Sequence, residues 1–364
     1  MFGQEHRETL VHMGNLAQVL TEQGKYNTAE ELYRQALKGL EKVLGFEHVY
    51  TLACVNGLAG SLKDQDKIQE AEGLHRRALN GRERLLGPEH PHTLSSIHNV
   101  AVVLEEQGKN QEAEEMYRRA LQGRKKVLGK EHPSTLSTLH GLAISLKDRN
   151  KDEAVDMMRR CLKAREKVIG QEHEDTLRSL YELALMLEDQ YKDEAEGLLR
   201  RCIEGEEKVL GKEHPDTLLS LYKLAMLLED QNKGEAETLL RRCIEGEEKV
   251  FGKEHPEVLK SLYKLAELLW NQDKNEEATG IMQRCVQGFE KVLGKEDPWT
   301  LASVRALEQF SAAMPVDEQE STPCSPFTTS SAEGQPEREE EEDETQEHID
   351  SDIGSSSQLA SVPT

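Results

Sequence analysis

The sequence predicts an all-α solenoid of helix-turn-helix repeats, and two observations lead to this fold class. First, one octapeptide recurs eight times, each copy beginning at a glycine 41 or 42 residues from the next: GQEHRETL, GFEHVYTL, GPEHPHTL, GKEHPSTL, GQEHEDTL, GKEHPDTL, GKEHPEVL and GKEDPWTL. Second, only 36% of the residues are hydrophobic and 4% aromatic, whereas 32% are charged. This composition suits thin stacked layers better than one large core.

Each repeat is expected to begin with a helix just after the octapeptide's glycine. In GKEHPDTL, Gly211 ends the preceding helix in a left-handed conformation, and Pro215 opens the next one, where its missing N–H does no harm. The following apolar residues are spaced i, i+3, i+4, as on one face of a helix over 215–230. They are Leu218, Leu221, Leu224, Ala225 and Leu228.

A second helix, over 235–250 of the same repeat, is indicated by the same spacing. Its apolar residues are Ala236, Leu239, Leu240, Cys243, Ile244 and Val250. The segment between the two helices is one residue shorter in repeats four to six than in repeats one to three and seven. Because loops tolerate such length changes and helix interiors do not, this segment is predicted to be a turn.

The repeats resemble the tetratricopeptide family, whose signature has a large residue, leucine and a small residue in the first helix, then small, aromatic and small residues in the second. The matching residues are Leu16, Ala17, Ala29, Tyr33 and Ala36 in repeat one, and Val100, Ala101, Ala113, Tyr117 and Ala120 in repeat three. The 42-residue period and the linker G-x-E-H-P-x-T-L are similar to those of kinesin light chains and nephrocystin-type proteins. The resemblance covers roughly residues 3–310 and implies a right-handed superhelical solenoid. That family's Asn-Asn pair before Leu-Ala is present only in part, for example as Gly14-Asn15 and Asn56-Gly57.

The chain is expected to divide into two parts. Residues 1–310 form the repeat array, with seven repeats and a C-terminal capping helix that begins at Trp299. Residues 311–364 form a disordered acidic tail, because Pro, Ser, Thr and acids replace the apolar periodicity. From Pro315 onward there are fourteen acids and one base, Arg338. The chain starts inside the first linker, which suggests a fragment of a longer protein.

Recurrent histidines and cysteines are expected to be structural. Six histidines share one linker position: His48, His90, His132, His173, His214 and His255. Their copies lie too far apart to share a metal ion, since packed helices are already about 8–10 Å apart. Four cysteines share the small position of the second helix: Cys161, Cys202, Cys243 and Cys285. The sequence has no phosphate-binding loop, nucleophile elbow or H-E-x-x-H motif, so we expect no enzyme, cofactor or metal site.

Paired acids and paired bases also recur in the second helices. They include Glu206-Glu207, Glu247-Glu248, Arg200-Arg201 and Arg241-Arg242. We expect them to form solvated faces with i, i+4 ion pairs.

The family resemblance implies a groove on the concave face, which the first helices line. In that family the residue three positions before the small alanine points into the groove. The predicted groove also includes the residue one helical turn after that position. The predicted groove residues are Asn56, His98, Val102, His140, Ile144, Tyr181, Leu185, Tyr222, Met226 and Tyr263. Between repeats three and six this groove would be apolar and aromatic, with Arg178, Lys223 and Lys264 nearby for an acidic peptide. The alternative role of these residues is packing between neighbouring repeats.

The sequence therefore predicts a non-enzymatic scaffold or adaptor that binds peptide segments of other proteins, acidic ones included. A net charge of -23 argues against nucleic acid and anionic membranes, which reward clustered Lys and Arg. No apolar run could span a bilayer, and the start MFGQEHRETL has no signal pattern, so a cytoplasmic location is expected. Two alternatives remain open: a kinesin-light-chain-like cargo adaptor or ciliary (nephrocystin-like) component, and a regulator that acts through the acidic tail.

Overall fold

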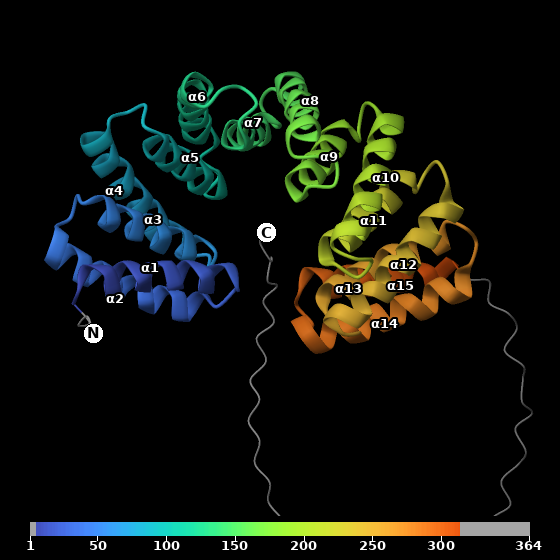
Figure 1. Cartoon of the computed structure of the whole chain (residues 1–364). Helices are drawn as coiled ribbons and strands as arrows, with labels where there is room; N and C mark the ends of the chain where they lie inside the picture. The colour runs from blue at the N-terminus through green and yellow to red at the C-terminus, as the bar shows by residue number, and fades with distance from the viewer. Residues whose placement is uncertain (1–4, 314–364) are drawn as a thin grey trace, which may run out of the picture.

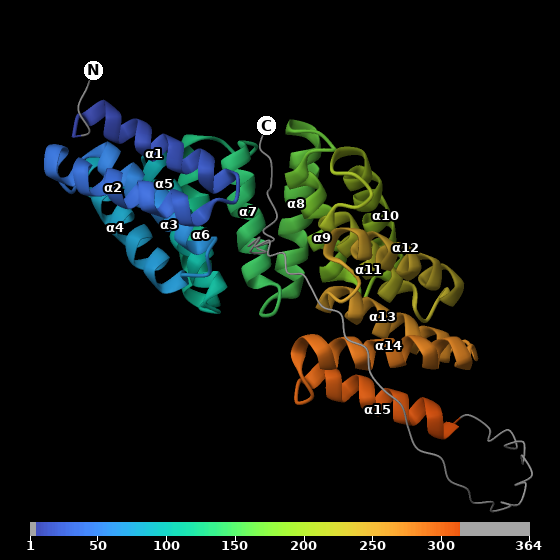
Figure 2. The same cartoon turned by 90° about the horizontal axis from the view of Figure 1, so that it is seen from below.

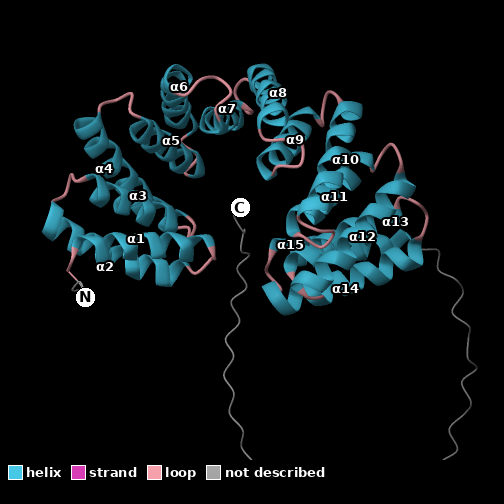
Figure 3. Ribbon diagram, in the orientation of Figure 1, coloured by secondary structure: helices cyan, strands magenta, loops and turns pink. Residues whose placement is uncertain are grey.

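The computed structural model describes residues 5–313, which form 15 α-helices joined by turns (Figures 1 and 3). Seven helix pairs follow one another, and a single helix ends the array. The bounds are α1 Arg7–Glu22, α2 Tyr26–Leu44, α3 Val49–Lys63, α4 Ile68–Leu86, α5 Pro91–Glu106, α6 Asn110–Val127, α7 Pro133–Leu146, α8 Lys151–Val168, α9 Glu174–Leu187, α10 Lys192–Val209, α11 Pro215–Leu228, α12 Lys233–Phe251, α13 Pro256–Trp270, α14 Asn275–Leu293 and α15 Pro298–Ala313.

The helix pairs stack into an open arch (Figure 1). Each helix packs mainly on its neighbours along the chain. The first helices of the pairs, such as α3, α5, α7 and α9, lie on the inner side of the arch, and α4, α6, α8 and α10 lie outside them (Figure 1). The view from below shows the two halves of the array running in different directions (Figure 2). The predicted all-α solenoid of helix-turn-helix repeats is confirmed.

The recurrent octapeptide forms the junction between repeats. In GKEHPDTL, Gly211 has a φ of 97°, which a side chain would strain. His214 caps helix α11, because its Nδ1 accepts a hydrogen bond of 3.2 Å from the backbone N–H of Asp216. The hydroxyl of Thr217 donates to the Gly211 carbonyl at 2.9 Å, and Leu218 is buried. The linker residues are thus structural, and the histidine has a defined role as a helix cap.

One residue in the left-handed region accounts for the two turn lengths. The four longer turns each contain a residue with a φ between 61° and 73°: Gly24, Asp66, Gly108 and Asp273. The shorter turns lack it, and in two of them an asparagine caps the next helix. Asn150 accepts a hydrogen bond from the backbone N–H of Glu153, and Asn232 does the same for Glu235. The length change therefore falls in the turn, as predicted.

The buried core runs through the array as a stripe of small and aliphatic residues. Ala36, Ala78 and Ala120 are fully buried, and Cys161 and Cys202 take the same place in later repeats. The Cys202 thiol donates to the Leu177 carbonyl at 3.3 Å. This contact holds the second helix of a pair close to the first, so the cysteines are core residues as expected.

Helix α15 covers the last pair, and Phe310 stacks on Trp270 of α13 with ring centroids 4.1 Å apart. The helix continues to Ala313, three residues past the predicted boundary at residue 310. The rest of the predicted acidic tail, 314–364, lies outside the described residues. Among the helices of residues 5–313, none has the length and apolarity that crossing a membrane requires.

Candidate functional site

A cavity of about 500 Å³ lies on the inner side of the first three repeats. Helices α1, α3 and α5 supply most of its lining, and α2 and α4 close it from behind. Four amide side chains line it: Asn15, Gln18, Asn56 and Asn99. Each amide has both hydrogen-bond donors and acceptors. It can therefore bind the C=O and N–H groups of an extended peptide backbone.

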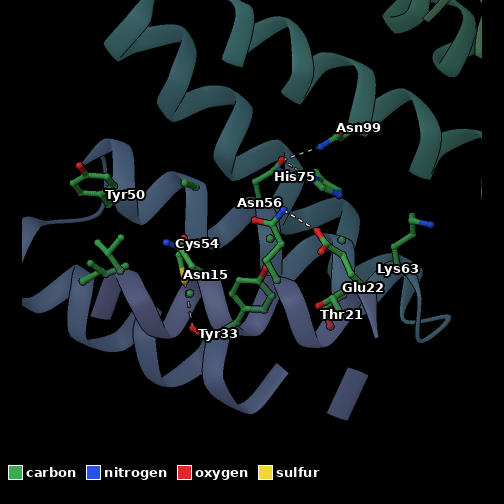
Figure 4. Close-up of a pocket in the computed structure, with 18 of the residues that line it drawn as sticks. Asn15, Thr21, Glu22, Tyr33, Tyr50, Cys54, Asn56, Lys63, His75 and Asn99 are labelled. Atoms are coloured by element: carbon green, nitrogen blue, oxygen red, sulfur yellow. Dashed lines mark hydrogen bonds between the residues drawn. The ribbon is translucent and has the colours of Figure 1, made fainter. Parts of the chain in front are cut away.

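The amide of Asn56 is the centre of a network that links three helices. Its Oδ1 accepts a hydrogen bond of 3.0 Å from Asn99 Nδ2 on α5 and lies 3.2 Å from His75 Nδ1 on α4. Figure 4 shows the three side chains together on one side of the cavity, with Tyr33 on the other. Because one oxygen joins three helices, Asn56 is held in one orientation.

Charged groups in this cavity are held by partners of their own. Lys63 forms ion pairs with Asp64 at 2.8 Å and Glu106 at 3.5 Å. Burial, Lys63 and Arg82 together lower the pKa of His75 to about 4, so this imidazole is neutral at pH 7. The cavity is therefore polar rather than strongly charged.

The second residue of a partial Asn-Asn pair depends on the size of the side chain that packs against it from the second helix of the preceding repeat. Tyr33 lies against the α3 backbone, where a Cβ on Gly57 would be 2.6 Å from its hydroxyl oxygen. Tyr117 meets Gly141 in the same way, at 2.7 Å. Where the second helix carries the smaller His75, the next repeat has Asn99 instead. Glycine is thus required after tyrosine, and asparagine fits after histidine.

The structure distributes the predicted groove residues over several environments. Asn56 and Val102 line the first cavity, and Tyr181 lines a second one described below. His140 is 7% exposed, with Nδ1 3.4 Å from both Arg165 Nη1 and Ser179 Oγ, so it lies in the packing between repeats. His98 packs on the Tyr117 ring, with centroids 5.5 Å apart.

The remaining predicted groove residues are half-buried and line neither cavity: Ile144, Leu185, Tyr222, Met226 and Tyr263. Most of the predicted set packs at the edge of the core. The family rule gives Gln18 as a groove position, one turn after Gly14, but Gln18 was not among the predicted groove residues, and the sequence analysis did not place Asn15 and Asn99 in the groove at all. The signal for two of them was present, since Asn15 and Asn99 are the surviving second members of the Asn-Asn pairs.

A second cavity of about 210 Å³ lies between α9, α10 and α11. Tyr181, Glu206 and Ser220 line it. The expectation that Glu206 and Glu247 lie on solvated faces is wrong, because they are only 5% and 7% exposed. Both glutamate side chains point from the second helix toward the following repeat, where a serine hydroxyl lies close to the carboxyl group.

Of the other paired charges, Arg200 and Arg241 form the expected i, i+4 ion pairs, whereas Arg201 and Arg242 pair across repeats, with Glu166 and Glu207. Arg200 pairs with Glu196 four residues earlier at 2.8 Å and with Glu235 of the next repeat at 2.8 Å. Arg241 pairs with Glu237 and Glu277 in the same pattern. No group of three or more His, Cys, Asp or Glu side chains in residues 5–313 is placed to hold a metal ion.

Family models for the tetratricopeptide repeat match most of the chain. One model matches residues 51–126, 95–167 and 175–249, and a second matches residues 9–50 and 258–298. The matched segments together cover most of helices α1 to α14 and end at residue 298, where α15 begins. Among curated proteins, none matches this sequence.

Several solved structures are similar to this chain. The apo form of the quorum sensor NprR from B. thuringiensis is 14% identical, with a TM-score of 0.53 over 85% of this chain and 89% of that one. BtubC (BKLC) from P. vanneervenii is 17% identical, with a TM-score of 0.50 over 73% and 99% of the two chains. Nearly identical TPR-like repeats of kinesin light chain type from Podosopora anserina are 29% identical, with a TM-score of 0.48 over 56% and 97%.

Proposed function

Because the chain belongs to the tetratricopeptide repeat family, we propose that it is a non-enzymatic scaffold that binds an extended segment of a partner protein along the inner side of the arch. The observation that carries this proposal is the 500 Å³ cavity with its four amide side chains. An extended segment exposes unpaired backbone N–H and C=O groups, and amides can satisfy both kinds. The fixed Asn56 network reduces the ordering cost of binding.

The cavity favours a segment of mixed polarity over a strongly charged one. Lys63 and Asp64 already neutralise each other at its edge. Tyr50 and Val102 offer aromatic and apolar surface beside the amides. We therefore expect affinity to depend weakly on salt, because few charges would be neutralised on binding.

Site-specific photo-crosslinking tests the location of the binding surface. A photoreactive phenylalanine analogue at Gln18, which is exposed within the cavity, should capture the partner in its native cell extract. The same analogue at Asn80, an exposed residue of outer helix α4, is the control and should capture none of that partner. Mass spectrometry of the conjugate identifies the protein and the segment.

Substitution then tests the amides themselves. Asn56→Ala with Asn99→Ala should preserve the helical circular dichroism and weaken binding of the identified segment by about tenfold or more, because a typical lost hydrogen bond costs about 1 kcal/mol. Asn80→Ala should leave the affinity unchanged. Equal capture from Gln18 and Asn80, or full affinity in the double variant, would remove the cavity from the proposal.

A narrower candidate is a kinesin-light-chain-like cargo adaptor. The observation that favours it is the linker G-x-E-H-P-x-T-L at a 41- or 42-residue period. Co-sedimentation with a kinesin heavy chain on microtubules is the test. Sedimentation above the level of the protein alone supports this role, and none leaves the general scaffold.

A further inference from the structure

One position of the second helices changes its chemistry along the array. Repeats two to four have an arginine there and repeats five and six a glutamate: Arg82, Arg124, Arg165, Glu206 and Glu247. All five side chains are buried. A buried ionic group has to be paired or hydrogen-bonded, so each version of the position implies a specific set of partners.

In the repeats with an arginine, the next repeat provides fixed hydrogen-bond acceptors for the guanidinium group. Arg165 Nη1 donates to the Asp175 carbonyl at 2.6 Å and to Ser179 Oγ at 2.8 Å. Arg124 Nη1 makes the same pair of bonds, to residues ten and fourteen positions later, at 2.7 and 2.6 Å. The acceptors belong to the first helix of the next repeat, so the arginine joins two repeats.

At Glu206 the acceptor residues remain, but the guanidinium is missing. Asp216 and Ser220, ten and fourteen residues later, line the 210 Å³ cavity together with Glu206. The shorter glutamate leaves this space open, and it is large enough to hold water molecules or a side chain of a partner. Glu206 Oε2 is buried and has no hydrogen-bond partner. A buried carboxylate oxygen without a partner is costly, so the site favours a donor from outside.

The charge of the cavity favours a cation. Four acids line it, Glu174, Glu182, Glu206 and Asp216, against one base, Arg178. Apart from Ser220, the other lining residues are apolar or aromatic, with Leu177 and Tyr181 among them. A planar guanidinium suits such a site, because it can donate to a carboxylate while it stacks on an aromatic ring.

We propose that this cavity binds an arginine side chain of the partner segment, in the place that Arg124 and Arg165 fill within their own repeats. The proposal rests on the proposed function, since the same inner side of the arch would hold the segment. It adds a requirement for a positive residue, whereas the sequence analysis named only acidic segments as a charged class of partner. The guanidinium would donate to the Glu206 carboxylate and to Ser220 Oγ.

Glu247 provides a matched control within the chain. It has the same repeat position, is equally buried and also has an unpartnered Oε2. It lines neither of the two cavities. The residues that correspond to Glu182 and Leu219 are Lys223 and Lys260 in this repeat, so its surroundings disfavour a cation.

Methyl NMR of the full chain tests the proposal directly. The probe is the capped peptide Ala-Ala-Arg-Ala-Ala, and the reporters are the methyl groups of Leu177, Leu210 and Leu219, which line the cavity. We expect saturable shifts of these methyl groups. A peptide with citrulline, which has nearly the same shape but no charge, should bind about tenfold more weakly or worse.

Three variants complete the experiment. Glu206→Gln should weaken the binding of the arginine peptide by about tenfold or more. Glu247→Gln should leave the affinity for this peptide unchanged. Glu206→Arg should abolish the shifts and raise the Tm, because its own guanidinium would fill the cavity as Arg165 does. Equal binding of the arginine and citrulline peptides, or arginine binding retained in Glu206→Arg, would overturn the proposal. Such a result would leave the scaffold role intact if Gln18 still captures the partner.

Discussion

Tyr33 and Tyr117 show how one side chain constrains the repeat that follows it. Each ring packs where the next first helix has a glycine, and Tyr117 also donates a hydrogen bond of 2.8 Å to Glu105. The ring is rigid and buried, so it cannot move aside for an added carbon. This explains why a glycine follows Asn56 and His140 in the Asn-Asn position, which the sequence alone did not reveal.

Gly141→Ala should therefore destabilise the protein. Its Cβ would lie 2.7 Å from the Tyr117 ring, and overpacking of this kind costs about 1–3 kcal/mol. Gly60→Ala is the matched control, because no atom lies within 4 Å of its Cβ and alanine favours a helix by roughly 0.5–1 kcal/mol. Urea denaturation followed by circular dichroism measures both. A stability for Gly141→Ala equal to that of Gly60→Ala would contradict the close contact.

Because of Glu206, the stability of the folded protein should fall as the pH rises, the opposite of the usual behaviour of a carboxyl group. Burial raises its pKa to about 7, although Ser220 and Cys202 oppose the rise. The folded state therefore binds a proton that the unfolded state has released, and the resulting stability is present below about pH 4.5 and lost as the pH rises through 7. Relative to Glu206→Gln, the wild type should lose on the order of 2 kcal/mol between pH 4.5 and 8. Thermal melts of both proteins across this range provide the measurement, and parallel curves would show that Glu206 has an ordinary pKa.

At the scale of the element, the linker histidines are helix caps. His132 Nδ1 accepts a hydrogen bond of 3.1 Å from the backbone N–H of Ser134 at the start of α7. In the last linker Asp297 does the same for Trp299, at 2.8 Å. His6 caps α1 in the same way, so the recurrence of histidine reflects seven equivalent helix starts rather than a metal site.

His132→Ala should lower the stability by about 1 kcal/mol, since it removes the cap. His132→Asp should retain it, because Asp297 shows that a carboxylate fits this geometry. His12→Ala, on the exposed surface of α1, serves as the control for loss of an imidazole elsewhere. The denaturation midpoints of the three variants decide the matter. If the alanine and aspartate variants at residue 132 melted alike, capping would not explain the histidine.

The helices were predictable because residues within each helix and its linker indicate where it begins and how long it is. Glycine, histidine and proline mark the start of α11, and the i, i+3, i+4 spacing marks its length. The turn was located from a one-residue difference, which the left-handed Asp66 and Asp273 explain. The buried position of Glu206 was not predictable in this way, because its neighbours are charged residues that do lie on the surface. Only the packing of the next repeat shows that it points inward.

At the scale of the molecule, the repeats contact their neighbours and form an open arch (Figure 1). Residues at equivalent positions are therefore spread along an axis. The groove residues were harder to predict than the fold. Their exposure depends on the packing between repeats, which local sequence does not record: a cavity lies at repeats one to three, whereas His140 is buried.

Small-angle X-ray scattering of residues 5–313 tests the stacked architecture most directly. A compact domain of this length would have a radius of gyration of about 19 Å. The open arch predicts a clearly larger radius and an asymmetric distribution of interatomic distances with a long tail. A radius near 19 Å with a symmetric distribution would mean that distant repeats come together, and it would contradict both the solenoid and the inner binding surface.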